Sequence, residues 1–327
     1  MSQENSQRLW MFKTMVVSRE FELAIKAAYL EGKQPVFNMA KGPIPGEMHL
    51  SNGQEPCAVG VCAHLRPTDA VTSTHRPHHV AIAKGVDIGR MAAEIFGRQE
   101  GLSGGRGGHM HLFDAAVNFC CSGIIAQGMG PAVGAAMAAR LAGRDDVAVS
   151  FIGEGAANQG AFHEALNLAA VWKAPVVFVI EDNAWGISVA KRASTAVSDN
   201  SARAASYGIP GVHIPGNDPD LIWEEAGKAI DRARKGGGPT LVEIETVRLE
   251  GHFMGDAEGY RPAEEMAGLA QRDAILIYRA RLEKEGVAQD VLDDLEHQAR
   301  QEVTAAIAFA RAGKAPTAAQ ALEKVFA

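Results

Sequence analysis

The sequence has no hydrophobic run long enough to cross a membrane. A spanning helix needs roughly 20 consecutive apolar residues, and no stretch of this chain approaches that length. The first nine residues are polar and contain no apolar core of the kind found in a secretion signal. We therefore expect no membrane association and a cytoplasmic location.

Cysteine is scarce, with four residues in a chain of 327. Cys120 and Cys121 are adjacent, which disfavours a disulfide between them. Cys57 and Cys62 lack the second pair of ligands that a zinc site would need. The sequence therefore predicts buried, reduced thiols rather than a disulfide framework or a structural zinc.

Positive charge is limited as well. The formal net charge is −7, and no block rich in Lys and Arg provides a local basic field. A nucleic-acid backbone attracts proteins through such a field. Nucleic-acid binding is therefore not expected.

The chain does contain apolar strand-like runs that alternate with helical periodicity. Its length and its 47% hydrophobic content allow a large buried core. Residues 147–152 and 176–180 read as buried strands around a helix over residues 157–173, which makes a βαβ unit. We predict an α/β fold with a mostly parallel sheet flanked by helices. The other expected elements are helices over residues 7–30, 56–65 and 219–234, strands over 69–74, 212–214 and 240–249, and a charged helical region after residue 262.

No linker or internal repeat divides the sequence, so we predict a single domain over residues 1–327 with helical N- and C-terminal extensions. Residues 97–110 are rich in glycine and are expected to form a loop. In the Ala/Gly-rich segment 123–143, Gly130, Gly134 and Ala138 recur at every fourth position. This spacing lets a helix approach a neighbour closely, either in the core or at a subunit contact.

Two polar residues are expected to meet at one edge of this sheet. Glu154 follows the first strand of the βαβ unit and Asn183 follows the second, and parallel strands end at the same edge. Gly155 and Ala156 are expected to open the connecting helix, whose free amides and positive dipole end suit a phosphate. The segment is therefore a candidate anion site.

Glu154 places a carboxylate inside that candidate anion site. A diphosphate would be repelled by it unless a divalent cation lay between them. Carboxylate and amide oxygens suit magnesium, which pairs a few protein ligands with phosphate oxygens and water. The sequence thus predicts a Mg²⁺ site, which calcium or manganese could also occupy.

Two other interpretations compete with this one. A glycine turn between a strand and a helix, followed by acidic residues after the next strand, is also typical of dinucleotide sites. Residues 153–160 lack the third glycine of that fingerprint, which also has no use for Glu154. An ordinary tight turn would explain the glycines but not Asn183.

The motif resembles that of a known family. Gly153-Glu154-Gly155 with Asn183 resembles the thiamine diphosphate motif, usually written GDG…N. The sequence between them, residues 156–173, is similar to that of the α subunit of 2-oxo acid and acetoin dehydrogenase complexes, with acetoin-type members most similar. The resemblance runs over residues 53–261 and includes the stretches 73–78, 107–111 and 251–261. It implies a thiamine diphosphate-binding fold.

The resemblance also implies roles for individual residues. Residues that match His75 and Arg76 contact the cofactor diphosphate, and the backbone at Gly123 and Ile125 lines the aminopyrimidine side. The carbonyl of Trp185 joins Glu154 and Asn183 as a metal ligand. The implied cofactor-binding set is His75, Arg76, Gly123, Ile125, Glu154, Gly155, Ala156, Asn183, Trp185 and His252.

The sequence contains both candidate catalytic and candidate structural histidines, and a lone histidine is more often structural than catalytic. His252 follows the strand over residues 240–249 at the sheet edge that holds Glu154, so we predict it to be catalytic, with His78 as a second candidate. A metal pair of His75 and His78 is an alternative, although the sequence identifies no third ligand. Structural roles are expected for His79, His109 and His163.

The family resemblance further implies a β subunit in an α2β2 heterotetramer. That subunit supplies the glutamate that activates the cofactor, and the pair cleaves the bond next to the carbonyl of a 2-oxo acid or acetoin. The acyl group would pass to the lipoyl carrier of an acyltransferase. Glu154 replaces the aspartate of the family and adds a methylene, ~1.5 Å. Two alternatives stay open: a two-subunit transketolase-like or acyloin-forming enzyme, and a non-catalytic α-like subunit.

Overall fold

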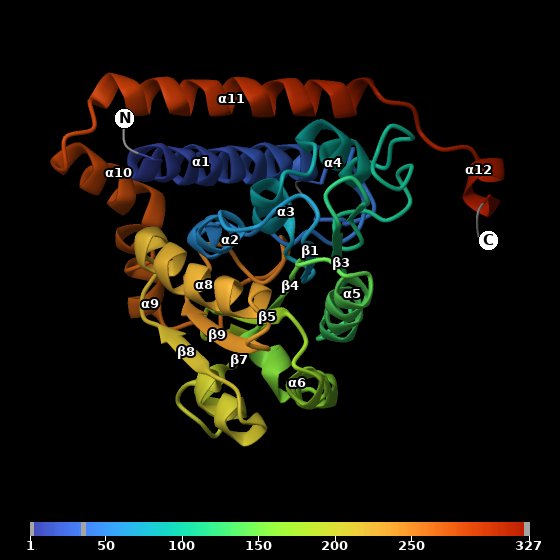
Figure 1. Ribbon diagram of the computed structural model, residues 1–327. Helices are drawn as coiled ribbons and strands as arrows, with labels where there is room; N and C mark the ends of the chain where they lie inside the picture. The colour runs from blue at the N-terminus through green and yellow to red at the C-terminus, as the bar shows by residue number, and fades with distance from the viewer. Residues whose placement is uncertain (1–2, 34–36, 324–327) are drawn as a thin grey trace.

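A seven-stranded sheet forms the centre of the computed structural model, which describes residues 3–33 and 37–323 (Figure 1). The strand order is β2-β3-β1-β4-β5-β9-β8, and every neighbouring pair is parallel except β2 and β3. The strands are β1 Ala70–Ser73, β2 Phe113–Asp114, β3 Phe119–Cys121, β4 Ala148–Gly153, β5 Val176–Asp182, β8 Gly211–Ile214 and β9 Thr240–Glu245, and a separate hairpin joins β6 Trp185–Gly186 to β7 Val189–Ala190. The predicted α/β class and mostly parallel sheet are confirmed.

Successive side chains of the central strands point to opposite faces of the sheet, and a hydrophobic cluster covers each face. On β5, Val177 and Val179 belong to one cluster, whereas Phe178 and Ile180 belong to the other. Such two-sided burial explains why β4 and β5 read as continuous apolar runs rather than as alternating ones.

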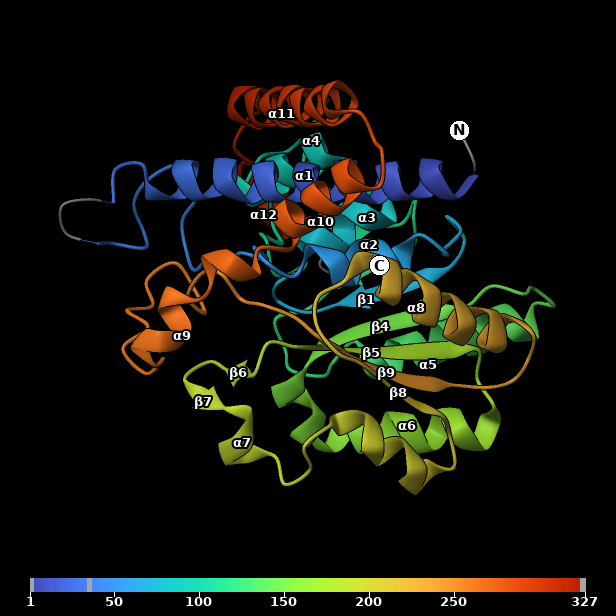
Figure 2. The ribbon, with the colours of Figure 1, turned by 90° about the vertical axis from the view of Figure 1, so that its left-hand side faces the viewer.

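Helices cover both faces (Figure 2). The larger cluster is formed with α1, α2, α3, α4, α8, α10 and α11, and the smaller with α5, α6 and η2. The helices are α1 Gln3–Leu30, α2 Glu55–Cys62, α3 His78–Lys84, α4 Ile88–Ile95, α5 Met129–Leu141, α6 Gly160–Trp172, α7 Lys191–Ser194, α8 Pro219–Arg234, α9 Ala263–Ala267, α10 Ala274–Lys284, α11 Gln289–Ala312 and α12 Ala318–Leu322, with 3₁₀ segments η1 Glu154–Asn158, η2 Asn200–Tyr207 and η3 Ala270–Arg272.

Several predicted boundaries differ from the structure. The connecting helix of the βαβ unit begins at Gly160 rather than at residue 157, because residues 154–158 form a separate 3₁₀ segment. The last central strand ends at Glu245, not at residue 249. Beyond it the Thr246 amide still donates to the carbonyl of Asp182 in β5, whereas the Leu249 amide donates to the Asn52 carbonyl of another segment. The predicted cap of α8 by Asp218 is confirmed.

The terminal helices form an outer layer. In Figure 1, α11 runs alongside α1 and over α4, so a helix from the N-terminal part of the chain packs against one from the C-terminal part. The predicted helical extensions are therefore present, although the first two residues of the polar N-terminus lie outside the described part of the chain. Within the described ranges, none of the helices has both the length and the apolar character needed to cross a bilayer.

The three small residues that recur at every fourth position of α5 are exposed rather than packed in the core. A Cβ added at Gly130 or Gly134 would meet no atom within 4 Å, and Ala138 is exposed on the same side. The core-packing explanation for this spacing is thus wrong, and the subunit contact stays a prediction.

The predicted glycine-rich loop is held by one buried carboxylate. Glu94 of α4 accepts hydrogen bonds from the amides of Ser103 at 2.7 Å, Gly105 at 2.9 Å and Gly107 at 2.6 Å. A Cβ at Gly101 would lie 2.5 Å from the Glu94 carboxylate. The glycines thus let the loop wrap closely around a single charged group.

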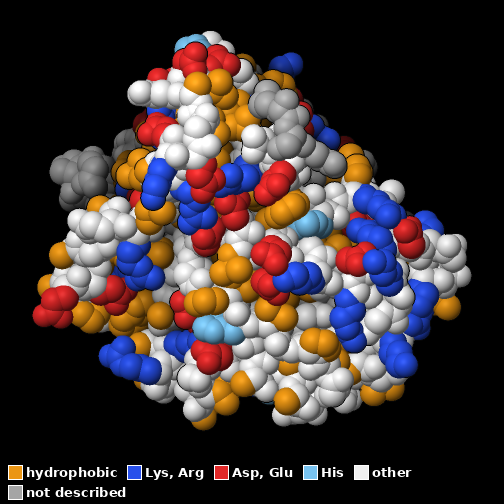
Figure 3. Space-filling model, turned by 60° about the vertical axis from the view of Figure 1, so that its left-hand side comes forward, with side chains coloured by type: hydrophobic (Ala, Val, Ile, Leu, Met, Phe, Trp, Pro, Cys, Tyr) orange, Lys and Arg blue, Asp and Glu red, His pale blue; other side chains and the backbone are white. Residues whose placement is uncertain are grey.

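The surface carries charges of both signs. On the face shown in Figure 3, acidic and basic side chains are interspersed over most of the area, with apolar side chains between them. All four cysteines are free; Cys57, Cys62 and Cys121 are buried, as predicted, whereas Cys120 is only partly buried.

Candidate active site

A cavity of about 410 Å³ opens where β1, β4 and β5 end. Its walls come from the turns after these strands, from the segment 122–128, from the β6–β7 hairpin and from the segment after β9. The carboxyl ends of parallel strands meet at this edge, which is the usual location of a ligand site in such sheets. Most of the predicted site residues lie here, namely His75, Arg76, Ile125, Glu154, Gly155, Ala156, Asn183, Trp185 and His252.

Glu154 lies at the floor of this cavity with only 2% of its surface exposed. Its Oε2 accepts a long hydrogen bond of 3.4 Å from the backbone amide of Asn183, whereas its Oε1 has no hydrogen-bond partner among the residues that the structure describes. Burial, together with the nearby charge of Asp182, raises the pKa of Glu154 to about 7. A buried carboxylate oxygen without a partner is costly, and a cation is the kind of ligand that would satisfy it.

Asn183 is oriented by a network of hydrogen bonds. Its Nδ2 donates to Gln54 Oε1 at 2.9 Å, and its Oδ1 accepts from the Trp185 amide at 3.2 Å. Between them, Ala184 adopts φ +69°, a left-handed conformation that a non-glycine residue rarely takes. The chain therefore bends sharply after β5, and Asn183 and Trp185 both reach the cavity.

The turn after β4 differs from the prediction. Gly155 and Ala156 belong to the 3₁₀ segment η1 and not to the first turn of α6. Gly155 and Ala156 therefore do not lie at the positive dipole end of a long helix. They still line the cavity directly beside Glu154.

Two arginines form a cationic wall. The Arg76 guanidinium donates to the Leu50 carbonyl and, at 2.9 Å, to the His252 carbonyl. Arg248 is 1% exposed, and its only described donation is to the Tyr260 hydroxyl at 2.8 Å, so that its Nε and Nη1 have no partner. Burial and the neighbouring Arg248 lower the pKa of Arg76 to about 10. Together the two side chains would attract an anion.

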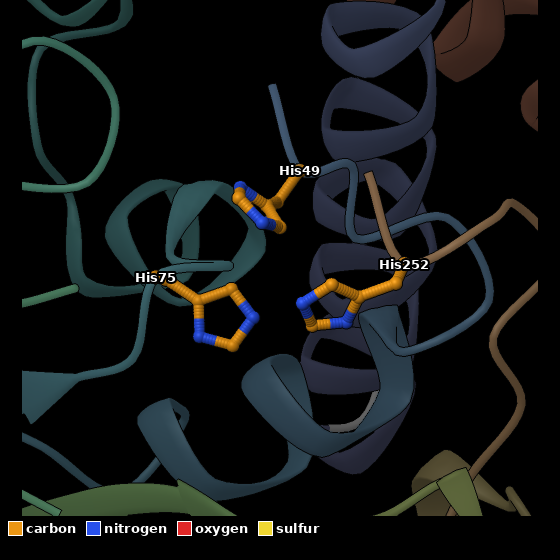
Figure 4. Close-up of side chains that lie close together, drawn as sticks. All are labelled: His49, His75 and His252. Carbon is orange, nitrogen blue, oxygen red and sulfur yellow. The ribbon is translucent and has the colours of Figure 1, made fainter. Parts of the chain in front are cut away.

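Three histidines meet beside the arginines (Figure 4). His49 comes from the segment before α2, His75 follows β1 and His252 lies beyond β9, and their ring centroids are 4.7 to 5.2 Å apart. His75 and His252 line the cavity, whereas His49 is buried behind them. Burial and the charges of Arg76 and Arg248 lower the pKa of His252 to about 4, so its imidazole is neutral at pH 7.

The other histidines lie outside the cavity wall. His78, the second catalytic candidate, is buried, and its Nδ1 contacts Glu22 Oε2 at 2.9 Å. His79 contacts Glu181 at 2.5 Å, and His109 contacts His49 at 3.1 Å. Among the described residues, the group of potential metal ligands that contains His75 consists of His49, His75 and His252, and His78 is not part of it. A catalytic role for His78 stays a prediction that its position does not support.

The mouth of the cavity is apolar. Ile124, Ile125, Ile187 and Val189 line it and are each about half exposed. Gly123 itself does not line the cavity, although residues 122 and 124 on either side of it do. Ile187 adopts φ +55° at the tip of the β6–β7 hairpin, a strained conformation for a β-branched residue.

Sequence reasoning missed three residues of this site: His49, Gln54 and Arg248. His49 and Gln54 lie in a segment without periodicity, where no pattern shows which side chains point inward. Arg248 lies inside the segment that was predicted to be a strand. The sequence did contain one signal for Arg248. Arg248 and His252 follow the buried strand β9, just as His75 and Arg76 follow β1.

Comparison with known families defines the class of protein. Residues 13–319 match the family model described as dehydrogenase E1 component. The chain therefore belongs to this family of thiamine diphosphate-dependent oxidoreductases, as its motif predicted.

Individual relatives give a finer view. The chain is 40% identical to the α subunit of acetoin:2,6-dichlorophenolindophenol oxidoreductase from Bacillus subtilis (strain 168), an alignment that covers 100% of this chain and 95% of that protein. It is 39% identical to the protein of the same description from Cupriavidus necator, over 97% of this chain and 93% of that one. It is 36% identical to the chloroplastic pyruvate dehydrogenase E1 component subunit alpha-3 of Arabidopsis thaliana, over 98% and 74% respectively. The chain is thus similar to α subunits, which implies a β subunit.

Proposed function

We propose that this chain binds the diphosphate of thiamine diphosphate through Mg²⁺ in the cavity and, with a β subunit, cleaves the carbon–carbon bond next to a carbonyl. Acetoin is the first substrate to test and pyruvate the second, following the relatives' names. The observation that carries the proposal is the unpartnered Glu154 Oε1 at the end of β4, facing the turn that holds Asn183. A cation would satisfy Glu154 Oε1, and an anion would neutralise the nearby guanidinium groups of Arg76 and Arg248.

The residues present fit a hard divalent metal. Glu154 would supply a carboxylate oxygen, Asn183 its side-chain oxygen and Trp185 its backbone carbonyl. Oxygen donors of this kind, completed by phosphate oxygens and water, suit Mg²⁺. The unpartnered oxygen supports metal binding despite the replacement of the family's aspartate by Glu154.

The cationic wall would hold the diphosphate. Arg76 is fixed by two backbone carbonyls and Arg248 offers two unpartnered nitrogens, so both guanidinium groups are positioned before a ligand arrives. His75 and the backbone of Gly155 and Ala156 would add neutral donors. Ile125 at the cavity wall would face the aminopyrimidine ring, and the backbone of Gly123, two residues earlier, would lie beside it.

When bound, thiamine diphosphate supplies the carbanion that attacks the carbonyl and the ring that stores the electrons. The protein has to orient the substrate and move a proton. His252 is suited to the second task because its ring lies at the cavity wall and is neutral at pH 7. It would accept or return a proton at the substrate oxygen.

The apolar mouth supports a subunit contact. Ile124, Ile125 and Ile187 surround the opening and are exposed in the isolated chain, and a buried subunit interface would cover such side chains. We propose that the β subunit of an α2β2 heterotetramer closes the cavity from this side and supplies the glutamate that activates the cofactor. A lipoyl carrier would then accept the acyl group.

Coexpression with the β subunit tests the proposal. The purified complex should reduce 2,6-dichlorophenolindophenol with acetoin or pyruvate, and should require both Mg²⁺ and thiamine diphosphate. Asn183→Ala should abolish the activity, and Lys228→Ala on the outer face of α8 should not change it. Metal-dependent cofactor binding without turnover of either substrate would leave a transketolase-like or acyloin-forming activity, which sugar and aldehyde substrates would reveal. Absence of metal-dependent binding would refute the proposal and favour a non-catalytic subunit.

A further inference from the structure

His49, His75 and His252 bring three ring nitrogens close together beside the cavity. One ring nitrogen from each lies within 4.8 Å of the other two. The three rings face a common space in Figure 4, and they come from three separate segments of the chain. His75 Nε2 is buried and has no hydrogen-bond partner among the described residues.

The tautomer of His49 is fixed by His109. The backbone amide of His49 donates to His109 Nε2 at 3.3 Å, so that nitrogen carries a lone pair and no proton. His49 Nδ1 lies 3.1 Å from the same atom and must therefore carry the proton that it donates. His49 Nε2 is then left unprotonated, which is the form that binds a metal.

We propose that these three imidazoles bind a transition-metal ion such as Zn²⁺ or Co²⁺, at a site separate from the Mg²⁺ site. Three neutral nitrogens suit such ions and suit Mg²⁺ poorly. With metal–nitrogen bonds of about 2.0–2.1 Å, tetrahedral ligand nitrogens lie roughly 3.3 Å apart, so the rings must close by up to about 1.5 Å. Rotation of the half-buried His75 and His252 side chains can supply this movement.

The fourth ligand would be an anion. Arg76 and Arg248 stand beside the cluster and disfavour a bare cation, but a hydroxide, phosphate or carboxylate from the cavity would offset their charge. Such an ion would engage His75 and His252, and so would occupy the cavity wall. The site is therefore inhibitory in character, although ion binding itself does not depend on the proposed function.

Cobalt spectroscopy on the full chain, freed of cofactor and of other metals, tests this site. Titration with CoCl₂ in the presence of inorganic phosphate should give one Co²⁺ per chain with the intense visible absorption of a four-coordinate ion. His49→Ala should lose this absorption and weaken Co²⁺ binding at least tenfold. Glu154→Gln, which alters the Mg²⁺ site, and His163→Ala, which removes a histidine far from the cluster, should keep it.

The positioning role of His109 gives a second test. His109→Ala should weaken Co²⁺ binding roughly 10–100-fold, the effect typical of losing an outer partner of a ligand histidine. His109→Gln, which retains an acceptor, should recover part of that loss. Only the weak absorption of a six-coordinate ion, or tetrahedral absorption that survives in His49→Ala, would overturn the assignment. Circular dichroism of each variant would show that the fold is intact.

Discussion

Arg248 allows a prediction in which stability and ligand binding change in opposite directions. The side chain is buried, and two of its nitrogens have no partner. An unsatisfied buried polar group costs about 1–3 kcal/mol, whereas the hydrogen bond to Tyr260 contributes about 1 kcal/mol. The two nitrogens together cost about 2–6 kcal/mol, so Arg248→Met should stabilise the ligand-free chain by about 1–5 kcal/mol.

The gain can be expressed as a melting temperature. An unfolding entropy of about 2.1 cal/mol/K per residue gives about 0.7 kcal/mol/K for this chain, so Tm should rise by about 1.5–7 °C. The same substitution should weaken binding of inorganic pyrophosphate. Loss of one hydrogen bond to a charged group, about 1.5–3 kcal/mol, corresponds to roughly 10–100-fold in Kd.

A neighbouring arginine serves as the matched control. Arg261 is also buried, but its guanidinium donates to Glu258, to Glu265 and to the Arg248 carbonyl. Arg261→Met should lower Tm, because it removes a side chain whose donors are paired. Thermal unfolding by circular dichroism and pyrophosphate titration by calorimetry measure the two effects. If Arg248→Met destabilises the chain as Arg261→Met does, or binds pyrophosphate as the parent does, the assignment of Arg248 as an anion ligand is wrong.

The remaining predictions concern the metal, the catalyst and two glycines. The pKa of Glu154 is raised to about 7, and a metal binds only its ionised carboxylate. The affinity for Mg²⁺ should therefore fall roughly tenfold for each pH unit below 7 and should level off above pH 7. Calorimetry that gives a pH-independent affinity between pH 5 and 7 would contradict this. His252→Gln should lower kcat with either substrate by roughly 10²–10⁴-fold while Mg²⁺-dependent binding of thiamine diphosphate changes little, and a loss confined to binding would assign His252 to the cofactor alone. At Gly60 of α2, an added Cβ would lie 2.5 Å from Ile222 Cγ2 of α8, so Gly60→Ala should lower stability by about 1–3 kcal/mol. At Gly134 an added Cβ would meet no atom within 4 Å, so Gly134→Ala should stabilise the free chain by about 0.5–1 kcal/mol. The same substitution should weaken assembly with the β subunit, which gel filtration would show. Unchanged assembly would contradict a close contact at α5.

The sheet could be predicted where burial dominates the sequence. The strands β4 and β5 are covered on both faces, so their apolar runs stand out, and α8 is marked by Asp218 and Pro219. The end of β9 could not be predicted, because the sequence of residues 246–249 continues the polar–apolar alternation of the strand. Thr246 still bonds to Asp182 of β5, whereas the Leu249 amide bonds to Asn52 of another segment. A local pattern cannot reveal that choice of partner.

The site was predictable to a similar degree. Glu154 and Asn183 follow strands, and the geometry of a parallel sheet brings such positions together. His49 could not be placed in the same way, because tertiary packing alone brings its segment against His75 and His252. The 3₁₀ turn at Gly155 was also beyond local reasoning, since glycine permits several conformations and the sequence does not select one.

The carboxylate of Glu94 links a distant helix to the protonation of the site. By gathering three amides of the glycine-rich loop, it sets the path of the backbone that leads to His109, and His109 decides which nitrogen of His49 carries the proton. A residue that touches neither cofactor nor substrate can thus act on the chemistry of the cavity through proton placement alone. Substitutions of Glu94, or of the glycines around it, would then change the tautomers of the active-site histidines before they disturb the fold.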